Sequence, residues 1–417
     1  MAQSSVLKTK NLKSFNPLLW GTIGYLFLFI FRPFEYWEWL GTYHIERIYM
    51  IGLIFVVTFW SGKRYKHHPI ATALLVFFGV ICFSVAIAYR PDKALDQVWE
   101  YFKLIVLFFV ILLSVRNERD FRILVIALLA ITGIYVGKSL WEFVVHGRHV
   151  YRMGFRRLVG IDKTFGDPNT FAATILYSLP FAVALWKTSV SNRLKLGLMF
   201  YGVMCVAAIG LTGSRAGMVS FIFFLFLLWT RGKMKIIGAL GVIVVLAVAW
   251  YALPGQYQMR FETIYDDSIN RSATTSAQGR WEGLKKGVRL FELSPLWGWG
   301  VGNFPYAVEA IGVTDQMQSH NLYGQLLAEL GILGSIAFIW LCYLIFKTQR
   351  DVLNLKPKRP KDNLFLQMSI ASFNTLLLLL FQGNFGHNLY RYTWVWICAI
   401  LIISHHFSMR NLTQKDA

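Results

Sequence analysis

The sequence predicts an all-α membrane protein that crosses the bilayer many times, and three observations support this prediction. Of its 417 residues, 56% are hydrophobic. Only 15% are charged, whereas a soluble domain of this size would carry roughly a quarter. Apolar runs long enough to cross about 30 Å of hydrocarbon recur along the chain and alternate with short loops. We therefore treat residues 1–417 as a single integral membrane domain.

About twelve membrane-spanning helices are expected from these apolar runs. The only sizeable piece outside the membrane is the loop of residues 254–319, which is expected to contain short helices. Its polar segment at 266–278, rich in Ser and Thr, is expected to be mobile. The expected spans are 17–31, 48–60, 69–89, 99–115, 121–145, 168–186, 196–211, 215–229, 236–253, 320–346, 364–382 and 391–408.

The distribution of Lys and Arg sets the expected orientation in the membrane. With an even number of spans, both termini lie on the same side, and every segment on that side is basic. The positive-inside rule assigns that side to the cytoplasm. Most cations on the other side fall in two loops, 146–167 and 254–319. Because these cations oppose the general bias, they indicate an anionic substrate outside the cytoplasm.

Several other classes of function are disfavoured. The net charge is +20, and the Lys and Arg residues that produce it flank the spans. Anionic lipid headgroups are therefore expected partners and nucleic acid is not. The four cysteines lie inside apolar segments and are expected to be buried thiols. The Gly-rich stretch 298–302 resembles a dinucleotide-binding loop, but no strand precedes it. No group of His, Cys and carboxylate residues has metal-site spacing, so neither a metal nor a cofactor is expected.

Arg215 is the first candidate for binding an anion. It lies in the short turn 212–217 between two apolar spans, with almost no loop to carry it away from the bilayer surface. The planar guanidinium group suits bidentate contact with phosphate and keeps its charge. Polar residues at membrane depth are costly and usually mark a site or a pathway. The alternative is an arginine that extends to lipid headgroups.

Arg280 is the second candidate, at the start of an expected helix that continues to about Phe291. At about 100° per residue, Arg289 projects on the opposite side of this helix. Arg289 and Lys285 can pair with Glu282 across helical turns, so their face is expected to meet solvent or headgroups. Arg280 is therefore preferred over Arg289, and its alternative is an ordinary surface arginine.

His320 is the candidate base, because histidine has an ordinary pKa near neutrality and can accept a proton from a hydroxyl group. The tetrapeptide His-Asn-Leu-Tyr at 320–323 recurs at 387–390, and both copies open a span at the outer face. This repeat makes His387 a weaker second candidate. A histidine at the interface can also be purely structural.

The remaining candidates would bind the substrate at the same outer surface. The three arginines of the first basic loop can guide or clamp a polyanion, although lipid phosphates explain them equally well. Asp167 and Asn169 are expected to cap the sixth span, and Asp167 can also orient an arginine. The candidate substrate-binding residues are Arg152, Arg156, Arg157, Asp167, Asn169, Arg289, Asn321, His387 and Arg391.

Four motifs occur together in the second half of the chain. They are Leu-Thr-Gly-Ser-Arg-Ala-Gly at 211–217, Gly-Arg-Trp at 279–281, Pro-Leu-Trp-Gly-Trp-Gly-Val-Gly-Asn-Phe at 295–304, and His-Asn-Leu-Tyr at 320–323 with Glu-Leu-Gly at 329–331. In this order and at the outer face, they resemble the O-antigen ligase family over residues 160–345. The N-terminal half matches through its span pattern and Gly-Asp-Pro-Asn at 166–169.

This resemblance implies a glycosyltransferase of lipopolysaccharide biosynthesis with a periplasmic active site. The family's reaction would move a glycan from undecaprenyl pyrophosphate to lipid A–core, with inversion and without a metal. Arg215 and Arg280 would then stabilise the pyrophosphate leaving group, and His320 would activate the acceptor hydroxyl. The expected partners are the lipid-linked donor, lipid A–core and membrane lipids.

Other activities remain open at this point. The same superfamily contains O-antigen polymerases and protein O-oligosaccharyltransferases, although the latter often carry a further large periplasmic segment that is absent here. A transporter or flippase for the lipid-linked glycan would also have a cationic outer surface. Such a transporter is expected to line a cavity with charges at mid-bilayer depth, and only Lys103 and Lys138 fall clearly within the spans. A ligase is therefore the first choice.

Overall fold

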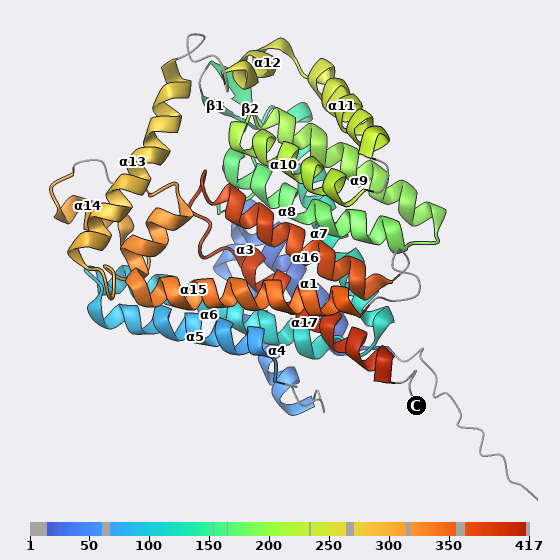
Figure 1. Ribbon diagram of the computed structural model, residues 1–417, viewed down its shortest axis with the longest axis horizontal. Helices are drawn as coiled ribbons and strands as arrows, with labels where there is room; N and C mark the ends of the chain where they lie inside the picture. Colours follow the sequence, from blue (N-terminus) through green and yellow to red (C-terminus); the bar gives the residue numbers. More distant parts are fainter. Residues whose placement is uncertain are drawn as a thin grey trace, which may run out of the picture.

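The computed structural model is almost entirely α-helical, and many of its long helices lie side by side (Figure 1). It describes residues 15–60, 67–152, 154–164, 166–232, 235–263, 271–313, 318–355 and 363–413. Twelve helices coincide with the twelve expected spans. They are α1 (Pro17–Phe31), α4 (Ile45–Trp60), α5 (Pro69–Phe83), α6 (Pro91–Ser114), α7 (Glu118–Val145), α8 (Pro168–Thr188), α9 (Asn192–Leu211), α10 (Arg215–Arg231), α11 (Lys235–Ala252), α15 (Leu322–Asn354), α16 (Leu364–Gln382) and α17 (Tyr392–Thr413).

These helices confirm the prediction of an all-α, multi-pass membrane protein. Among the described residues, ten segments are long and apolar enough to cross a bilayer. The two expected spans outside this group are α4 and α10, which contain only 16 and 17 residues. The fourth span was expected to begin at residue 99, whereas α6 begins at Pro91. Proline suits the first turn of a helix, and the polar residues that follow it hid this start from a search for apolar runs.

Capping side chains start several of these helices. The Asn16 side chain accepts a hydrogen bond from the backbone N–H of Leu19 at the start of α1. Asp167 does the same for Asn169 at 2.9 Å, which confirms the expected cap of α8. Such bonds satisfy backbone N–H groups that have no partner within the helix. These helix starts are therefore encoded locally in the sequence.

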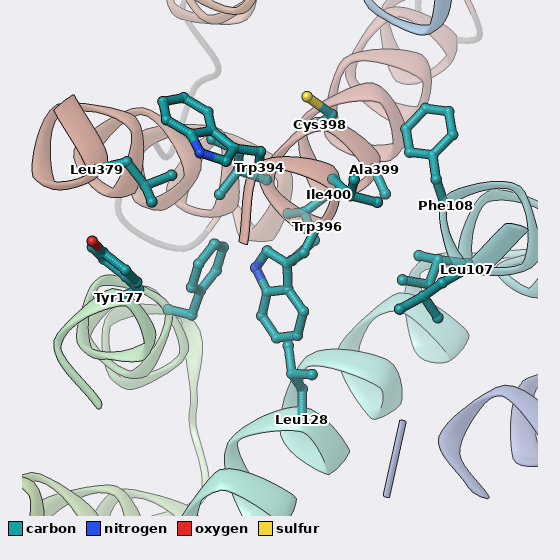
Figure 2. Close-up of a cluster of buried hydrophobic side chains, with 14 of the residues drawn as sticks. Leu107, Phe108, Leu128, Tyr177, Leu379, Trp394, Trp396, Cys398, Ala399 and Ile400 are labelled. Atoms are coloured by element: carbon teal, nitrogen blue, oxygen red, sulfur yellow. The ribbon is translucent and has the colours of Figure 1, made fainter. Parts of the chain in front are cut away.

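The core lies where α16 and α17 pack against α8, α15 and α6. Figure 2 shows its centre, where Trp394 and Trp396 of α17 lie near Tyr177 of α8 and Leu128 of α7. By contrast, no residue of α11 is buried, although the helix is strongly apolar. An apolar helix with no protein cover fits a surface that faces lipid. The four cysteines were expected to be buried. Cys205 and Cys398 are buried and Cys342 is half-buried, but the expectation is wrong for Cys82, which is exposed.

The remaining elements are short, apart from one helix. They are α2 (Pro33–Tyr36), α3 (Glu38–Thr42), the 3₁₀ helix η1 (Ser84–Ile87), β1 (Val150–Arg152), β2 (Phe155–Arg157), α12 (Gly255–Glu262), α13 (Arg271–Leu293) and α14 (Phe304–Ala310). The strands β1 and β2 form an antiparallel hairpin. Figure 1 shows α13 and α14 at one end of the bundle and the end of α17 at the opposite end.

The helix α13 is longer than the sequence suggested. The segment 266–278 was expected to be mobile, but residues 271–278 belong to α13, and residues 266–270 lie outside the described part. Glycines bring α13 against the start of α15, because a Cβ at Gly283 would lie 1.8 Å from the backbone oxygen of Ser319. A Cβ at Gly287 would lie 2.5 Å from the oxygen of Gly324. Only glycine permits this close packing of the two helices.

The Gly-rich stretch 295–304 follows α13 and is held against α15 by backbone hydrogen bonds; we call it the Gly-rich joint. Trp299 donates its backbone N–H to the oxygen of Ala328 at 2.8 Å, and Ile332 donates to Pro295 at 2.9 Å. Between these bonds, α15 is interrupted at Gly331, where φ is +57°. A Cβ there would lie 2.7 Å from the oxygen of Leu296, so glycine is required. The Gly-rich joint thus holds the C-terminal end of α13 against the N-terminal part of α15.

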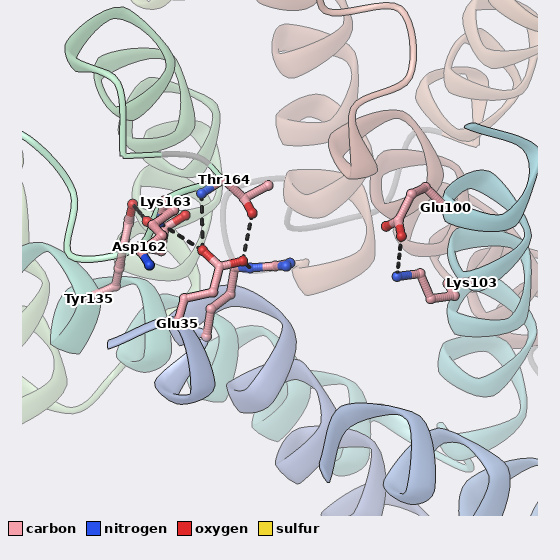
Figure 3. A network of polar contacts seen from close by, with 8 residues as sticks. Glu35, Glu100, Lys103, Tyr135, Asp162, Lys163 and Thr164 are labelled. Atoms are coloured by element: carbon pink, nitrogen blue, oxygen red, sulfur yellow. Dashed lines mark hydrogen bonds and ion pairs between the residues drawn. The ribbon is translucent and has the colours of Figure 1, made fainter. Parts of the chain in front are cut away.

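Both lysines within the spans pair with glutamates on their own helices. Lys103 lies 2.7 Å from Glu100, as Figure 3 shows, and Lys138 lies 2.6 Å from Glu142. A paired lysine costs less free energy at membrane depth than a lone charge. Figure 3 also shows Glu35 accepting backbone hydrogen bonds from Lys163 at 2.7 Å and from Thr164 at 3.0 Å. These bonds tie the 158–164 segment to α2.

Candidate active site

The hairpin turns one arginine of the first basic loop into the protein. Side chains alternate along a strand, so Phe155 and Arg157 of β2 are buried while Arg156 is exposed. The Arg157 Nε donates to the backbone oxygen of Thr212 at 2.7 Å, and its Nη2 donates to Asn169 Oδ1 at 3.1 Å. Arg157 therefore joins the start of α8 to the turn after α9.

Arg215 occupies the first position of α10. Ser214 caps this helix by accepting from the N–H of Gly217 at 3.1 Å. The Arg215 Nη1 donates to the backbone oxygen of Thr263 at 3.1 Å, and the side chain is almost fully buried. The helix α12, which precedes Thr263, contributes the buried Arg260. The turn after α9 is thus covered by α12.

Arg157, Arg215, Arg260 and Arg280 form what we call the arginine cluster. Burial and the charge of Arg215 together lower the pKa of Arg280 to about 10. The pKa of Arg260 is also lowered to about 10, by burial and then by the other three arginines. Burial lowers the pKa of Arg157 as well; the charges of Arg152 and Arg215 add to this effect and that of Asp167 opposes it. All three remain charged at neutral pH, so the cluster is a partly desolvated concentration of positive charge.

The helix α13 brings Arg280 toward the loop between α16 and α17. Its guanidinium group lies over the ring of Phe385, 5.4 Å from the centroid. Gly283, one turn further along α13, packs against Ser319. Arg280 is thus the member of the arginine cluster that comes from the helix packed against the segment of His320.

The two copies of His-Asn-Leu-Tyr meet in the structure. The ring centroids of His320 and His387 are 5.2 Å apart, with the rings inclined by 57°. The N–H of Leu322 donates to the backbone oxygen of Gly383 at 2.7 Å, which joins the two segments. His320 has a φ of +46°, a left-handed conformation that is uncommon outside glycine and marks a constrained turn.

His387 is exposed, yet protein atoms surround much of its ring. This partial burial lowers the pKa of His387 to about 4, with further contributions from His320 and Arg391 and an opposing one from Asp167. Each of these neighbours comes from a different connection in the fold. At neutral pH His387 is therefore an uncharged imidazole next to His320.

The other residues of the two copies have different partners. Asn321 caps α15 by accepting from the N–H groups of Tyr323 and Gly324, both at 3.0 Å. Asn388 instead donates to the backbone oxygen of Leu379 at 2.9 Å and so anchors its loop to α16. The same tetrapeptide therefore caps a helix in one copy and fastens a loop in the other.

Tyr390, from the second copy, donates to Glu329 Oε2 at 2.6 Å. Glu329 is fully buried and also accepts from the N–H of Phe304 at 3.3 Å. The Glu329 carboxylate thus links the His-Asn-Leu-Tyr copy at 387–390 to the Gly-rich joint at 295–304.

The remaining candidate residues lie around this centre. Arg391 donates to the oxygen of Thr170 at 3.1 Å. Arg152 is exposed and lies 4.0 Å from Asp167. Arg289 lies on the exposed side of α13. Arg156 has an exposed side chain, and its backbone oxygen accepts a hydrogen bond from the Tyr257 hydroxyl at 2.6 Å.

Arg260 was not identified from the sequence, because it stands in a short polar stretch without a motif. A signal was present: Tyr257, Arg260 and Phe261 lie on one side of the amphipathic helix α12 and are all buried. Among the described residues, no group of three His, Cys, Asp or Glu side chains is placed to hold one metal ion.

Comparison with known families gives one match. Residues 200–339 match the family model described as O-antigen ligase. The matched range contains Arg215, Arg280 and His320, whereas Arg157 and His387 lie outside it. No curated protein matches the chain. The family match confirms the resemblance to the O-antigen ligase superfamily and supports a glycan-transferring role in O-antigen or lipopolysaccharide biosynthesis.

Proposed function

We propose that this protein is a glycosyltransferase of the O-antigen ligase type. It transfers a glycan from undecaprenyl pyrophosphate to a hydroxyl of lipid A–core at the periplasmic face of the inner membrane. The family match supports the class of reaction. The observation that carries the specific assignment is the buried arginine cluster next to a pair of histidines.

The arginine cluster binds the donor through its diphosphate group. Arg215 and Arg280 make the principal contacts, and Arg157 and Arg260 add positive charge around them. Guanidinium groups bind phosphate oxygens in bidentate fashion. Their attraction is strong here because burial has removed much of the screening water. As the glycan leaves, negative charge grows on the departing phosphate oxygen, and prepositioned cations stabilise that charge most in the transition state.

His320 activates the acceptor. The acceptor oxygen forms a bond to the anomeric carbon of the donor while the bond from that carbon to the phosphate oxygen breaks. The bonding electrons leave with the diphosphate, and the hydroxyl proton passes to the His320 ring. Attack opposite the leaving group inverts the anomeric configuration. The arginines supply the positive charge that this step needs at the leaving group.

His387 is a positioning residue in this scheme. Its ring packs against His320, and its lowered pKa keeps it uncharged at neutral pH. An uncharged partner does not repel the proton that His320 takes up. His387 thus holds the base in place and leaves proton transfer to His320.

The test is transfer by the purified protein in detergent with EDTA and an undecaprenyl-pyrophosphate glycan. Lipid A–core is added to one reaction and omitted from the other. Product that requires lipid A–core and is lost in Arg215→Ala, with the variant still folded in the membrane, is the expected result. Full activity of Arg215→Ala would contradict the leaving-group role.

Other results identify the alternatives. Chain extension without added acceptor would indicate an O-antigen polymerase. Transfer only to an added protein would indicate a protein O-oligosaccharyltransferase. Absence of product in every reaction, together with movement of the lipid-linked glycan across vesicles, would indicate a transporter.

A further inference from the structure

An apolar groove with a volume of about 630 Å³ lies between α7, α8 and α9. Its walls include Leu129, Leu185, Leu198 and Met204, and nearly all of the exposed lining is apolar. Gly133, Gly137 and Gly197 also line it. Because glycine has no side chain, these positions keep the space between the helices open. We call this space the α7–α9 groove.

The α7–α9 groove is long and opens on the side of the bundle. Its lining residues on α7 extend from Ile126 to Leu140, and the fourteen helical steps between them correspond to about 21 Å. The hydrocarbon core of a bilayer is about 30 Å thick, so the groove follows most of that depth. Ile134 and Phe200, which line it, are 53% and 68% exposed. A single chain can therefore enter from the surrounding lipid.

The arginine cluster lies at the outer ends of two of the helices that form the groove. Arg157 binds Asn169 at the start of α8 and Thr212 at the end of α9. The groove residue of α9 nearest to that end is Met204, about two helical turns before Thr212. Along α9 the groove and the cluster are thus about two helical turns apart.

We propose that the α7–α9 groove binds the polyprenyl tail of the lipid-linked donor while the arginine cluster binds its diphosphate. This inference rests on the proposed function. A diphosphate at the cluster places an attached apolar tail within the membrane next to α8 and α9. The groove offers that tail an apolar surface along much of its path. It also makes the tail a determinant of donor affinity, distinct from the glycan.

A matched pair of substitutions on α9 tests the proposal. A Cβ at Gly197 or at Gly202 would meet no other atom within 4 Å, so a side chain can begin at both positions and the two leucine variants form a matched pair. Gly197 lines the groove and Gly202 does not. Gly197→Leu should raise the KM for a long-tailed donor about tenfold and leave the KM for a short-tailed donor unchanged. Gly202→Leu should change neither value.

A binding measurement gives a result that does not depend on turnover. A photoactivatable polyprenyl diphosphate is expected to label peptides 126–140 and 194–204, and Gly197→Leu but not Gly202→Leu should reduce that labelling. Equal labelling in both variants would overturn the groove proposal. Labelling that a phospholipid analogue competes away equally well would also overturn it, by showing a site for bulk lipid only. Specific labelling without any transfer by the wild type would support the groove and contradict the proposed reaction.

Discussion

Two pairs of histidines lie at opposite ends of the bundle and have similar geometry. At the outer end, the ring centroids of His320 and His387 are 5.2 Å apart. At the other end, those of His68 and His405 are also 5.2 Å apart, and His68 Nε2 lies 3.3 Å from His405 Nδ1. In each pair one ring has a pKa lowered to about 4, His387 in the pair at the expected outer end and His68 in the other. By pair geometry and pKa alone the two ends are alike.

The surroundings distinguish them. The pKa of His68 is lowered mainly by burial, with smaller contributions from the neighbouring His405, His67 and His406. The pair of His68 and His405 has an acidic neighbour, Asp351, whereas the outer pair has Arg391 together with Asp167. Arg280 also contacts the loop that carries His387. A histidine pair is therefore a candidate for chemistry because of the charged groups around it. The following predictions test this difference.

The largest effect is expected from removing the base. His320→Ala should lower kcat by about 10²–10⁴, because a general base contributes that much to a rate. His405→Ala, at the other end, should change kcat less than twofold. Initial rates of glycan transfer by the purified variants measure both. Comparable losses in the two variants would show that histidine pairing matters only for the fold.

The second effect concerns the cations that distinguish the outer end. Arg280→Ala should lower kcat by about 10²–10³, as expected for losing one stabiliser of transition-state charge. Lys285→Ala is the matched control, because Lys285 lies on the same helix but is exposed and paired with Glu282 at 3.0 Å. Rates with saturating donor separate this effect from weaker binding. Equal losses in both variants would assign the effect to the general charge of α13.

A smaller effect is expected from the partner of the base. His387→Gln should lower kcat roughly five- to tenfold, since an aromatic pair contributes about 1 kcal/mol. The KM for the donor should stay within twofold, because His387 acts through His320. His387→Phe, which keeps a ring and cannot titrate, should restore most of the lost rate. Failure of phenylalanine to restore the rate, with His387→Gln impaired, would point to proton transfer by His387 itself.

The smallest effect is on stability and involves both ends. The pKa of His68 and His387 is about 4 in the folded protein and about 6.5 in an unfolded chain, so the unfolded state binds more protons between these values. Stability is therefore lost as pH falls from about 6.5 to 4.

His68→Asn keeps a capping side chain and removes the titration. It should reduce the fall in Tm between pH 7 and pH 5 by about 2 °C. His387→Gln should reduce it less, because His387 is exposed. Thermal unfolding in detergent measures both, and an unchanged pH dependence in His68→Asn would contradict the assignment.

The sequence by itself determined the class of fold. The free-energy cost of unsatisfied backbone groups in lipid forces each long apolar run into a helix, so the spans could be predicted one at a time. The cap at Asp167 and the turn that carries Arg215 were also predictable, because each depends only on residues within a few positions of the chain. The family match extends this local information to the class of reaction.

Only the tertiary structure decided which outer residues belong together. Arg156 and Arg157 are adjacent in sequence, yet the hairpin buries one and exposes the other. His387 joins His320 although 67 positions separate them, and Arg260 enters the cluster from a helix without a motif. Burial, and the field that neighbouring charges exert, depend on packing between distant segments. Sequence patterns describe residues near in the chain, so they could rank Arg280 above Arg289 on one helix but could not show which charged residues of different segments meet.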